Sequence, residues 1–152
     1  MLKVQDYFKK IQRSAEDMTM NEPDEEIHVL IVDDLPQVRQ GLATLLSLAA
    51  KNISPKIKVI GEAQNGSEAI EQARLLHPDV ILMDLKMPVL DGYTATQCIK
   101  STHPSIFIVV LTIHADPSTR QKAAQAGADA FVEKGAPLEE LIQAIHGYRQ
   151  TI

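Results

Sequence analysis

Four apolar stretches of the chain each end in polar residues that can take part in phosphoryl chemistry. The stretches are HVLIVDD, DVILMD, IFIVVLT and AFVEK, and the residues at their ends are Asp33 with Asp34, Asp84, Thr112 and Lys134. Carboxylates bind hard cations such as Mg²⁺, and an ammonium can pair with a phosphoryl group. A carboxylate can also attack phosphorus and form an acyl phosphate. These residue types predict a site for a divalent cation and a phosphoryl group, if the fold brings them together.

A fold of alternating strands and helices would bring these polar strand-end residues together. We expect strands near 28–32, 57–61, 79–83, 106–111 and 129–132, and helices near 36–50, 67–76, 92–101, 117–126 and 138–149. Continuous apolar strands are typical of parallel sheets covered on both faces. Five strand–helix units with short connections therefore predict an α/β fold with a doubly wound sheet. In such a sheet the carboxyl ends of the strands share one edge, where ligands bind.

The helix boundaries have local signals. Pro36, Pro117 and Pro137 stand where three of the helices begin, and proline is favoured at the first helical position. The last helix carries an apolar stripe that predicts packing against the sheet, made of Leu138, Leu141, Ile142 and Ile145.

Each site residue also has a purely structural interpretation. Asp33 or Asp34 could cap the following helix, and Asp84 could cap a helix or turn. Threonine is common in strands and lysine on surfaces, so Thr112 and Lys134 carry little information alone. Their shared position at strand ends favours the cation site. Three neighbouring acids would resist ionisation, and a bound cation would relieve that repulsion.

Composition narrows the class of protein. The 152 residues suggest one domain, and 45% hydrophobic and 23% charged residues are typical of a soluble globule. A net charge of −5 argues against direct nucleic-acid binding. No apolar run approaches the roughly 20 residues that span a bilayer, so we expect no membrane insertion. Cys98 is the single cysteine, which fits a cytoplasmic protein, and we expect it to be a small buried hydrophobe.

Residues 1–26 differ in character from the rest and are predicted to form an N-terminal extension and linker, with the main domain over 27–152. The stretch TMNEPDEE is typical of a linker. Before it, residues 2–18 have a heptad-like apolar stripe, made of Val4, Phe8, Ile11, Ala15 and Met18. A lone helix of this length is marginal in water, so it would need a partner surface: its copy in a homodimer, its own domain or another protein. The alternative is a frayed extension.

From Ile27 to Arg149 the chain resembles the receiver domain of bacterial two-component response regulators. The motifs that carry the resemblance are IVDD (31–34), MDLKMPVLDG (83–92), LT (111–112), AGADAFVEKG (126–135) and the final helix beginning PLEELIQAI. The resemblance implies a flavodoxin-like, five-stranded parallel sheet of order 2-1-3-4-5. It also implies phosphorylation by a sensor histidine kinase with Mg²⁺ as the cofactor.

The resemblance assigns roles by position. Asp84 matches the aspartate that accepts the phosphoryl group. Thr112 and Lys134 match residues that contact this group, and Phe131 matches an aromatic residue that moves inward on activation. The Mg²⁺ ligands would be Asp33, Asp34, Asp84 and the backbone carbonyl of Lys86. Such a chain promotes only its own phosphorylation and dephosphorylation, so we do not expect an enzyme in the usual sense. Activation would change the face made by 117–126, 129–132 and 138–149.

One departure from the family pattern points to a subclass. Lys134 is followed by Gly135, where proline is common, as in receivers of LuxR-type transcription regulators. A receiver cut from such a DNA-binding regulator and a stand-alone receiver both remain open.

An enzyme is the alternative function. A Mg²⁺-dependent aspartyl phosphohydrolase of the haloacid dehalogenase type also uses a strand-end aspartate, a hydroxyl and a lysine. That class has a second acid two residues after the nucleophile, where this chain has Lys86. It also places its metal-binding acids after the lysine rather than before it.

Overall fold

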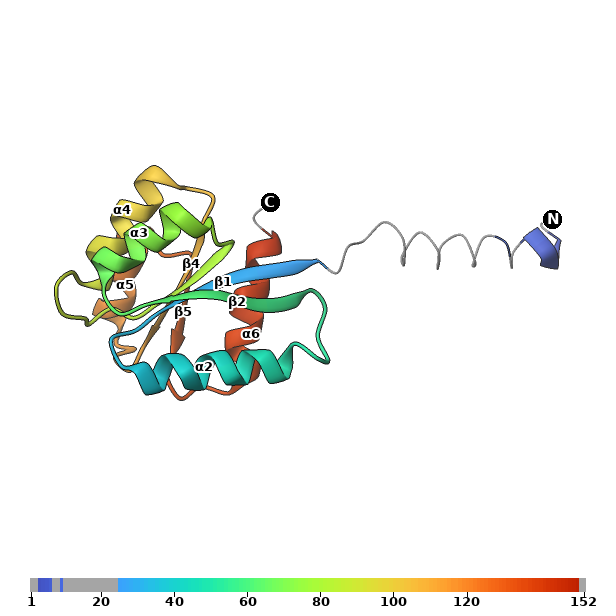
Figure 1. Cartoon of the computed structure of the whole chain (residues 1–152), viewed down its shortest axis with the longest axis horizontal. Coiled ribbons are helices and arrows are strands. Elements are labelled where there is room, and N and C mark those ends of the chain that lie inside the picture. The colour runs from blue at the N-terminus through green and yellow to red at the C-terminus, as the bar shows by residue number, and fades with distance from the viewer. Residues whose placement is uncertain (1–2, 7–8, 10–24, 151–152) are drawn as a thin grey trace.

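The computed structural model describes residues 3–6, 9 and 25–150. Within these residues, five parallel strands form one sheet in the order β2-β1-β3-β4-β5, shown edge-on in Figure 1. The strands are β1 (Glu26–Val32), β2 (Lys56–Ala63), β3 (Val80–Met83), β4 (Phe107–Thr112) and β5 (Ala130–Glu133). The predicted fold class and strand order are confirmed.

Helices cover both faces of the sheet. They are α2 (Pro36–Ala49), α3 (Gly66–Leu76), α4 (Gly92–Thr102), α5 (Pro117–Ala126) and α6 (Leu138–His146). Figure 1 places α2 and α6 on one side and α3, α4 and α5 on the other. The first pair buries Leu46, Leu141 and Ile145 against the sheet. On the other side, α3 and α4 bury mainly small residues, which lets these helices approach the strands closely.

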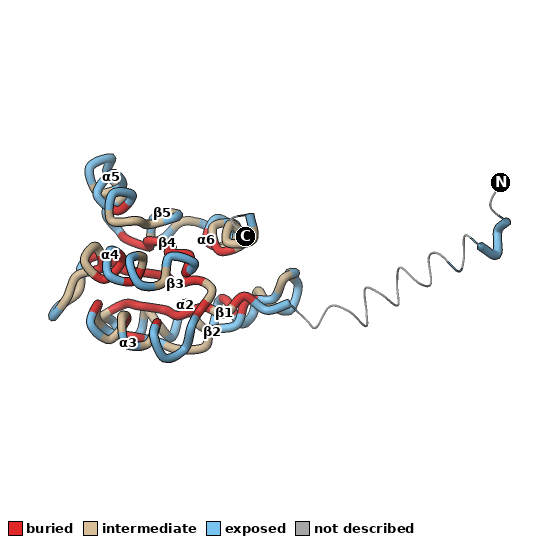
Figure 2. Tube along the Cα trace, turned by 90° about the horizontal axis from the view of Figure 1, so that it is seen from above, coloured by how far each residue is buried: buried red, intermediate tan, exposed pale blue. Residues whose placement is uncertain are grey.

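The apolar stretches of the sequence are the buried strands. Every residue of β3 and β4 is buried, and β1 is buried from Val29 onward. Figure 2 shows this burial running through the middle of the domain. Because both faces are covered, these strands show no polar alternation. A polar side chain can then enter only where a strand ends, which is where the site residues lie.

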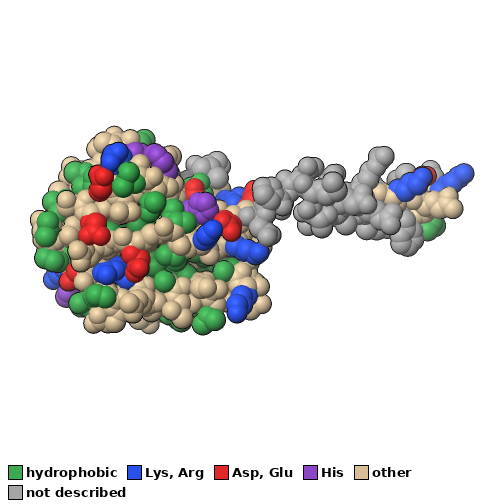
Figure 3. All heavy atoms as spheres, in the orientation of Figure 1, with side chains coloured by type: hydrophobic (Ala, Val, Ile, Leu, Met, Phe, Trp, Pro, Cys, Tyr) green, Lys and Arg blue, Asp and Glu red, His purple; other side chains and the backbone are tan. Residues whose placement is uncertain are grey.

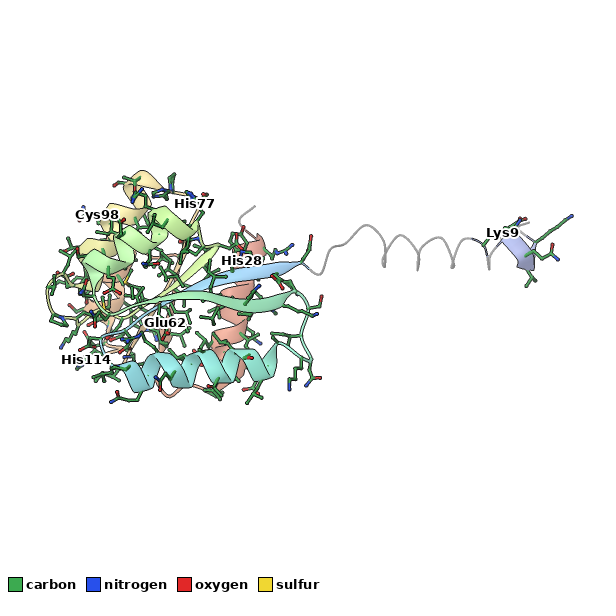
Figure 4. All side chains as sticks on the ribbon, viewed as in Figure 1. Lys9, His28, Glu62, His77, Cys98 and His114 are labelled. Atoms are coloured by element: carbon green, nitrogen blue, oxygen red, sulfur yellow. The ribbon has the colours of Figure 1, made fainter. Side chains whose placement is uncertain are left out.

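Two expectations are wrong. The last helix was predicted to reach residue 149, but α6 ends at His146 and a 3₁₀ turn spans Gly147–Gln150. Glycine favours the helical conformation poorly, and 3₁₀ turns are frequent at helix ends. Cys98 is exposed rather than buried, because the buried face of α4 is formed by Ala95, Thr96 and Ile99. Figure 4 shows Cys98 on the outer side of this helix.

Only a few residues of the N-terminal segment are described, so most of the predictions for it are not compared with the structure. Residues 4–6 and 9 are helical, and the remainder of the predicted helix over 2–18 lies outside the described residues. Strand β1 begins at Glu26, one residue before the predicted domain boundary, which itself stays a prediction. Among the described residues, no helix combines the length and apolar character needed to cross a membrane.

Candidate functional site

Three aspartates meet at the carboxyl edge of the sheet. Val32 of β1 is paired with Met83 of β3, so the next residues, Asp33 and Asp84, leave the sheet side by side. Asp34 completes the cluster, and one carboxylate oxygen from each of the three lies within 4.8 Å of the others. Asp33 and Asp84 are buried, with 2% and 6% of their surface exposed. The prediction that strand ends gather these acids is therefore confirmed geometrically.

The environment of Asp84 opposes its negative charge. Burial raises the pKa of the Asp84 carboxyl, and the nearby carboxylates of Asp33 and Asp34 raise it further. The ammonium of Lys134 and the backbone N–H of Leu85 act against this rise, and that N–H donates to Asp84 Oδ1 at 2.9 Å. The net effect on the pKa is upward because desolvation is the largest contribution.

Lys134 reaches two of the aspartates from the end of β5. Its Nζ lies 2.6 Å from Asp33 Oδ2 and 3.6 Å from Asp84 Oδ1. Lys134 therefore forms ion pairs with both aspartates, and the shorter of the two is with Asp33. Three carboxylates against one ammonium leave a formal charge of −2. A cluster of oxygen ligands with that excess charge suits a divalent cation such as Mg²⁺.

Neither Asp33 nor Asp84 caps a helix, although each carboxylate accepts a backbone hydrogen bond in the turn that follows its strand. Helix α2 has Leu35 as its N-cap, and no side chain caps it. Asp33 Oδ1 instead accepts a hydrogen bond from Leu35 N at 2.9 Å, which holds the carboxylate at the turn. Helix α4 is capped by Asp91, whose carboxylate accepts from Thr94 N, so Asp84 is not needed for that purpose.

Thr112 ends β4 and is 1% exposed. Its hydroxyl oxygen accepts a hydrogen bond from His114 N at 3.3 Å, and its carbonyl accepts one from Lys134 N at 2.8 Å. The exposed His114 lies at the end of the domain opposite to His28, as Figure 4 shows. Thr112 and Lys134 are thus tied together through the backbone beside the acidic cluster.

Phe131 lies on β5 and is half-buried against Leu85, Val110 and Ala123. The guanidinium of Arg120, on α5, is 4.4 Å from the centre of its ring. Arg120 Nε also donates to the carbonyl of Ala115 at 3.2 Å. Sequence reasoning missed this contact because the two residues belong to different elements and no motif links them.

The loop from β3 to α4 packs on the backbone of the site. A Cβ on Gly92 would collide with the carbonyl oxygen of Asp84, and Gly92 N donates to Leu85 O at 2.9 Å. Gly92 closes the MDLKMPVLDG motif, and only glycine permits so close an approach. Lys86, whose carbonyl is a predicted ligand, is an exposed residue of this loop. The packing role of Gly92 has no local sequence signal beyond the motif itself.

A second missed residue is Arg39. Its Nη1 donates to the backbone carbonyl of Asp33 at 2.6 Å, and its Nε lies 3.3 Å from Glu62 Oε1. This side chain connects α2, the end of β1 and β2 immediately beside the acidic cluster. Its spacing from Asp33 along the chain carries no recognisable signal.

Comparisons with known proteins agree with this geometry. The family model described as "Response regulator receiver domain" matches residues 29–146. The chain is 40% identical over 119 residues to "Response regulator GacA" of Pseudomonas viridiflava, covering 78% of this chain and 53% of that protein. It is 37% identical over 119 residues to "Transcriptional regulatory protein LnrK" of Bacillus subtilis, covering 78% and 52%. The chain therefore spans about half the length of these curated relatives.

Solved structures show the same fold. The receiver domain of the putative response regulator NarL from Mycobacterium tuberculosis superposes with a TM-score of 0.73 at 31% identity, covering 81% of this chain and 95% of that one. A LuxR-family response regulator from Aurantimonas sp. gives a TM-score of 0.71 at 33% identity, covering 79% and 82%. Together with the aspartate cluster beside a lysine and a threonine, these similarities show that the chain belongs to the response regulator receiver domain family.

Proposed function

We propose that this chain accepts a phosphoryl group on Asp84 from a sensor histidine kinase of a two-component system. The observation that carries the proposal is the buried Asp84 carboxylate, clustered with Asp33 and Asp34 and 3.6 Å from Lys134. Receiver domains as a family are phosphorylated by such kinases. The roles of the individual residues here are our assignment.

The chemistry follows from the positions of the groups. An oxygen of the Asp84 carboxylate attacks the phosphorus of the donor's phosphohistidine, the phosphorus–nitrogen bond breaks, and its electron pair leaves with the imidazole. The product is an acyl phosphate on Asp84. Lys134 and Thr112, which flank the cluster, would contact the oxygens of the transferred group and offset its charge.

The donor set fits Mg²⁺. Asp33, Asp34 and Asp84 supply oxygen ligands, and the backbone carbonyl of Lys86 would add another. When bound, the cation supplies charge neutralisation for an anionic donor that approaches three carboxylates. The raised pKa of Asp84 fits this requirement, because the site without a cation resists full ionisation.

Phosphorylation would act as a population shift between two conformations. We propose that Thr112 moves toward the phosphoryl group and that the Phe131 ring moves inward. This would alter the face made by α5, β5 and α6, which would be the output surface. We propose no activity on an external substrate, so the chain is a switch rather than an enzyme.

The wider context is also proposed. Lys134-Gly135 and the similarity to a LuxR-family regulator support the LuxR-type subclass. The chain spans about half the length of its curated relatives, and the two proposed contexts are a stand-alone receiver and the receiver part of a longer DNA-binding transcription regulator. Direct nucleic-acid contact by this chain is not expected from its net charge of −5, and we propose a cytoplasmic location.

Labelling tests the phosphoacceptor. Incubation with acetyl phosphate and Mg²⁺ should add one phosphoryl group, detected by intact-protein mass, and Asp84→Asn or a chelator should prevent it. Asp116→Asn removes an exposed carboxylate outside the site and should label like the wild type. The Thr112→Ala variant should still accept the phosphoryl group, but phosphorylation should change its NMR spectrum less than it changes that of the wild type. Labelling of the Asp84→Asn protein would contradict the assignment.

A further inference from the structure

An apolar groove runs between α2 and α6. Its cavity volume is about 350 Å³, and it is lined mainly by aliphatic side chains, among them Val38, Leu42, Leu45, Ala136, Leu138 and Leu141. The wall formed by α2 continues into exposed leucines, since Leu45 and Leu48 are 47% and 56% exposed. Figure 3 shows hydrophobic side chains along α2 on the face of the domain that it draws. Such a groove is of the kind that holds the apolar face of a helix.

We propose that residues 2–18 of the same chain bind this groove as an amphipathic helix. Their apolar stripe has the i, i+3/i+4 spacing that helix-in-groove recognition uses. Val4, the stripe residue with a described side chain, is 73% exposed, so the stripe lacks a covering surface there. The groove adjoins the acidic cluster, because Lys134 is one of its lining residues. The inference nevertheless does not depend on the function proposed above.

The point where the segment joins the domain favours this groove. Glu25, the residue before β1, forms an ion pair of 2.6 Å with Arg149, just beyond the end of α6. The chain therefore leaves the domain on the α6 side, at the amino edge of the sheet. Residues 19–24 can span up to about 20 Å when extended. A helix over 2–18 would be about 26 Å long, comparable with the ~21 Å of the 14-residue α2.

The charges at the two ends of the groove favour one orientation of the segment 2–18 within it. Joined at the amino edge, the segment would run parallel to α2, with its first residues near the carboxyl edge. That end of the groove has a net negative charge, because Glu133, Glu139 and Glu140 outnumber Lys134, and the segment begins with Lys3. The other end of α2 is followed by exposed Lys51, and the segment ends with Glu16 and Asp17. Opposite charges would meet at both ends.

Tethering selects the segment of the same chain over that of a second copy. A linker of a few residues gives an effective concentration in the millimolar range, provided that it can reach the site. A separate copy at micromolar concentration cannot match that. The groove should therefore be filled within the monomer.

Hydrogen exchange of the full chain tests the docking. Phe8→Glu with Ile11→Glu places two charges on the stripe and should make the amides of residues 38–48 and 132–142 exchange several-fold faster, with α4 unchanged. Lys9→Gln with Arg13→Gln changes the net charge equally on the opposite helix face, and should exchange like the wild type. Leu45→Lys alters the groove at a half-exposed position and should reproduce the first result.

Three outcomes would overturn the proposal. One is unchanged exchange at 38–48 and 132–142 in both the stripe and the Leu45→Lys variants. Another is equal acceleration in the Lys9→Gln, Arg13→Gln control, which would indicate a charge effect. The third is a wild-type solution mass of two chains that falls to one in the stripe variant, because the groove would then hold a second copy. A wild-type monomer with the exchange pattern above would support intramolecular docking.

Discussion

At the scale of single residues, opposing electrostatic effects act on the charge of the Asp84 carboxylate. Burial and two neighbouring carboxylates disfavour its charge, while Lys134 favours it from 3.6 Å. Lys134 lies closer to Asp33, at 2.6 Å, so its positive charge offsets the negative charge of Asp84 only in part. A bound cation would offset the unfavourable charge of Asp84, the proposed phosphoacceptor.

The raised pKa of Asp84 predicts how stability depends on pH. Between its unfolded and folded pKa values, the native protein binds more protons than the unfolded chain, so stability falls as pH rises through that window. Asp84→Asn should therefore melt a few degrees higher than the wild type at pH 7 in chelator, and the difference should shrink toward acidic pH. Thermal denaturation across pH 4–8 measures this.

Asp116 provides a control of opposite sign. Hydrogen bonds from Thr119 lower the pKa of the exposed Asp116 carboxyl, so its contribution is present at neutral pH and is lost as pH falls. Asp116→Asn should not gain stability at pH 7. A difference between Asp84→Asn and wild type that does not vary with pH would argue against an unfavourable charge at Asp84.

At the scale of elements, the start of α4 is packed on the backbone of Asp84. The contact at Gly92 leaves no space for a side chain, and it connects the backbone of Asp84, the proposed phosphoacceptor, directly to a helix. Gly41, by contrast, lies on α2, where an added Cβ would meet no atom within 4 Å. Two glycines in helices therefore have opposite expected responses to the same substitution.

Gly92→Ala should destabilise the protein by about 2 kcal/mol or more, because backbone atoms must shift to admit the methyl group. It should also reduce labelling at Asp84. Gly41→Ala should raise the free energy of unfolding by about 0.5–1 kcal/mol, since alanine favours a helix over glycine. Urea denaturation of both variants measures this, and similar effects at the two positions would show that the close approach at Gly92 is not limiting.

The contact between α5 and β5 leads to a prediction about the switch. A cation–π contact at an exposed site contributes about 0.5–1 kcal/mol, so the exposed Arg120 should hold the half-buried Phe131 ring in its present position. The Arg120→Ala substitution should raise the population of molecules with the Phe131 ring in its inward position by about two- to fivefold. Fluorine NMR of fluorophenylalanine-labelled protein can follow Phe131. Lys122→Ala, which removes a cation 5.9 Å from Tyr93 instead, should leave those populations unchanged.

At the scale of the whole molecule, cation binding is linked to folding. The cluster exists only when β1 and β3 are paired, so Mg²⁺ would bind the native state and not the unfolded chain. Such a ligand stabilises by about 2.7 kcal/mol at a hundredfold excess over its Kd. The melting temperature should therefore rise steadily with Mg²⁺ concentration, as calorimetry can measure.

Asp33→Asn should remove most of this rise, because it removes one of the clustered carboxylates. Glu71→Gln, which alters an exposed ion pair on α3, should retain it. An equal Mg²⁺ response in the two variants would mean that the cation acts through general charge screening rather than at this cluster.

The sequence by itself determined the order of strands and helices along the chain and which polar residues stand at the strand ends. Buried strands are continuous apolar runs, and their polar ends are local signals, so Asp33, Asp84, Thr112 and Lys134 could be selected from the chain alone. The strand order came from the resemblance, because periodicity does not specify which strands are neighbours. The end of α6 and the exposure of Cys98 were predicted less well. The exposure of Cys98 depends on which face of α4 packs against the sheet.

Only the tertiary structure decided which charges pair and which surfaces stay open. Lys134 and Asp33 are 101 positions apart, and their 2.6 Å contact depends on the relative placement of β1 and β5. The same is true of Arg120 over Phe131 and of the groove between α2 and α6. Distances of this kind result from the packing of several elements at once, and no local pattern in the chain encodes them.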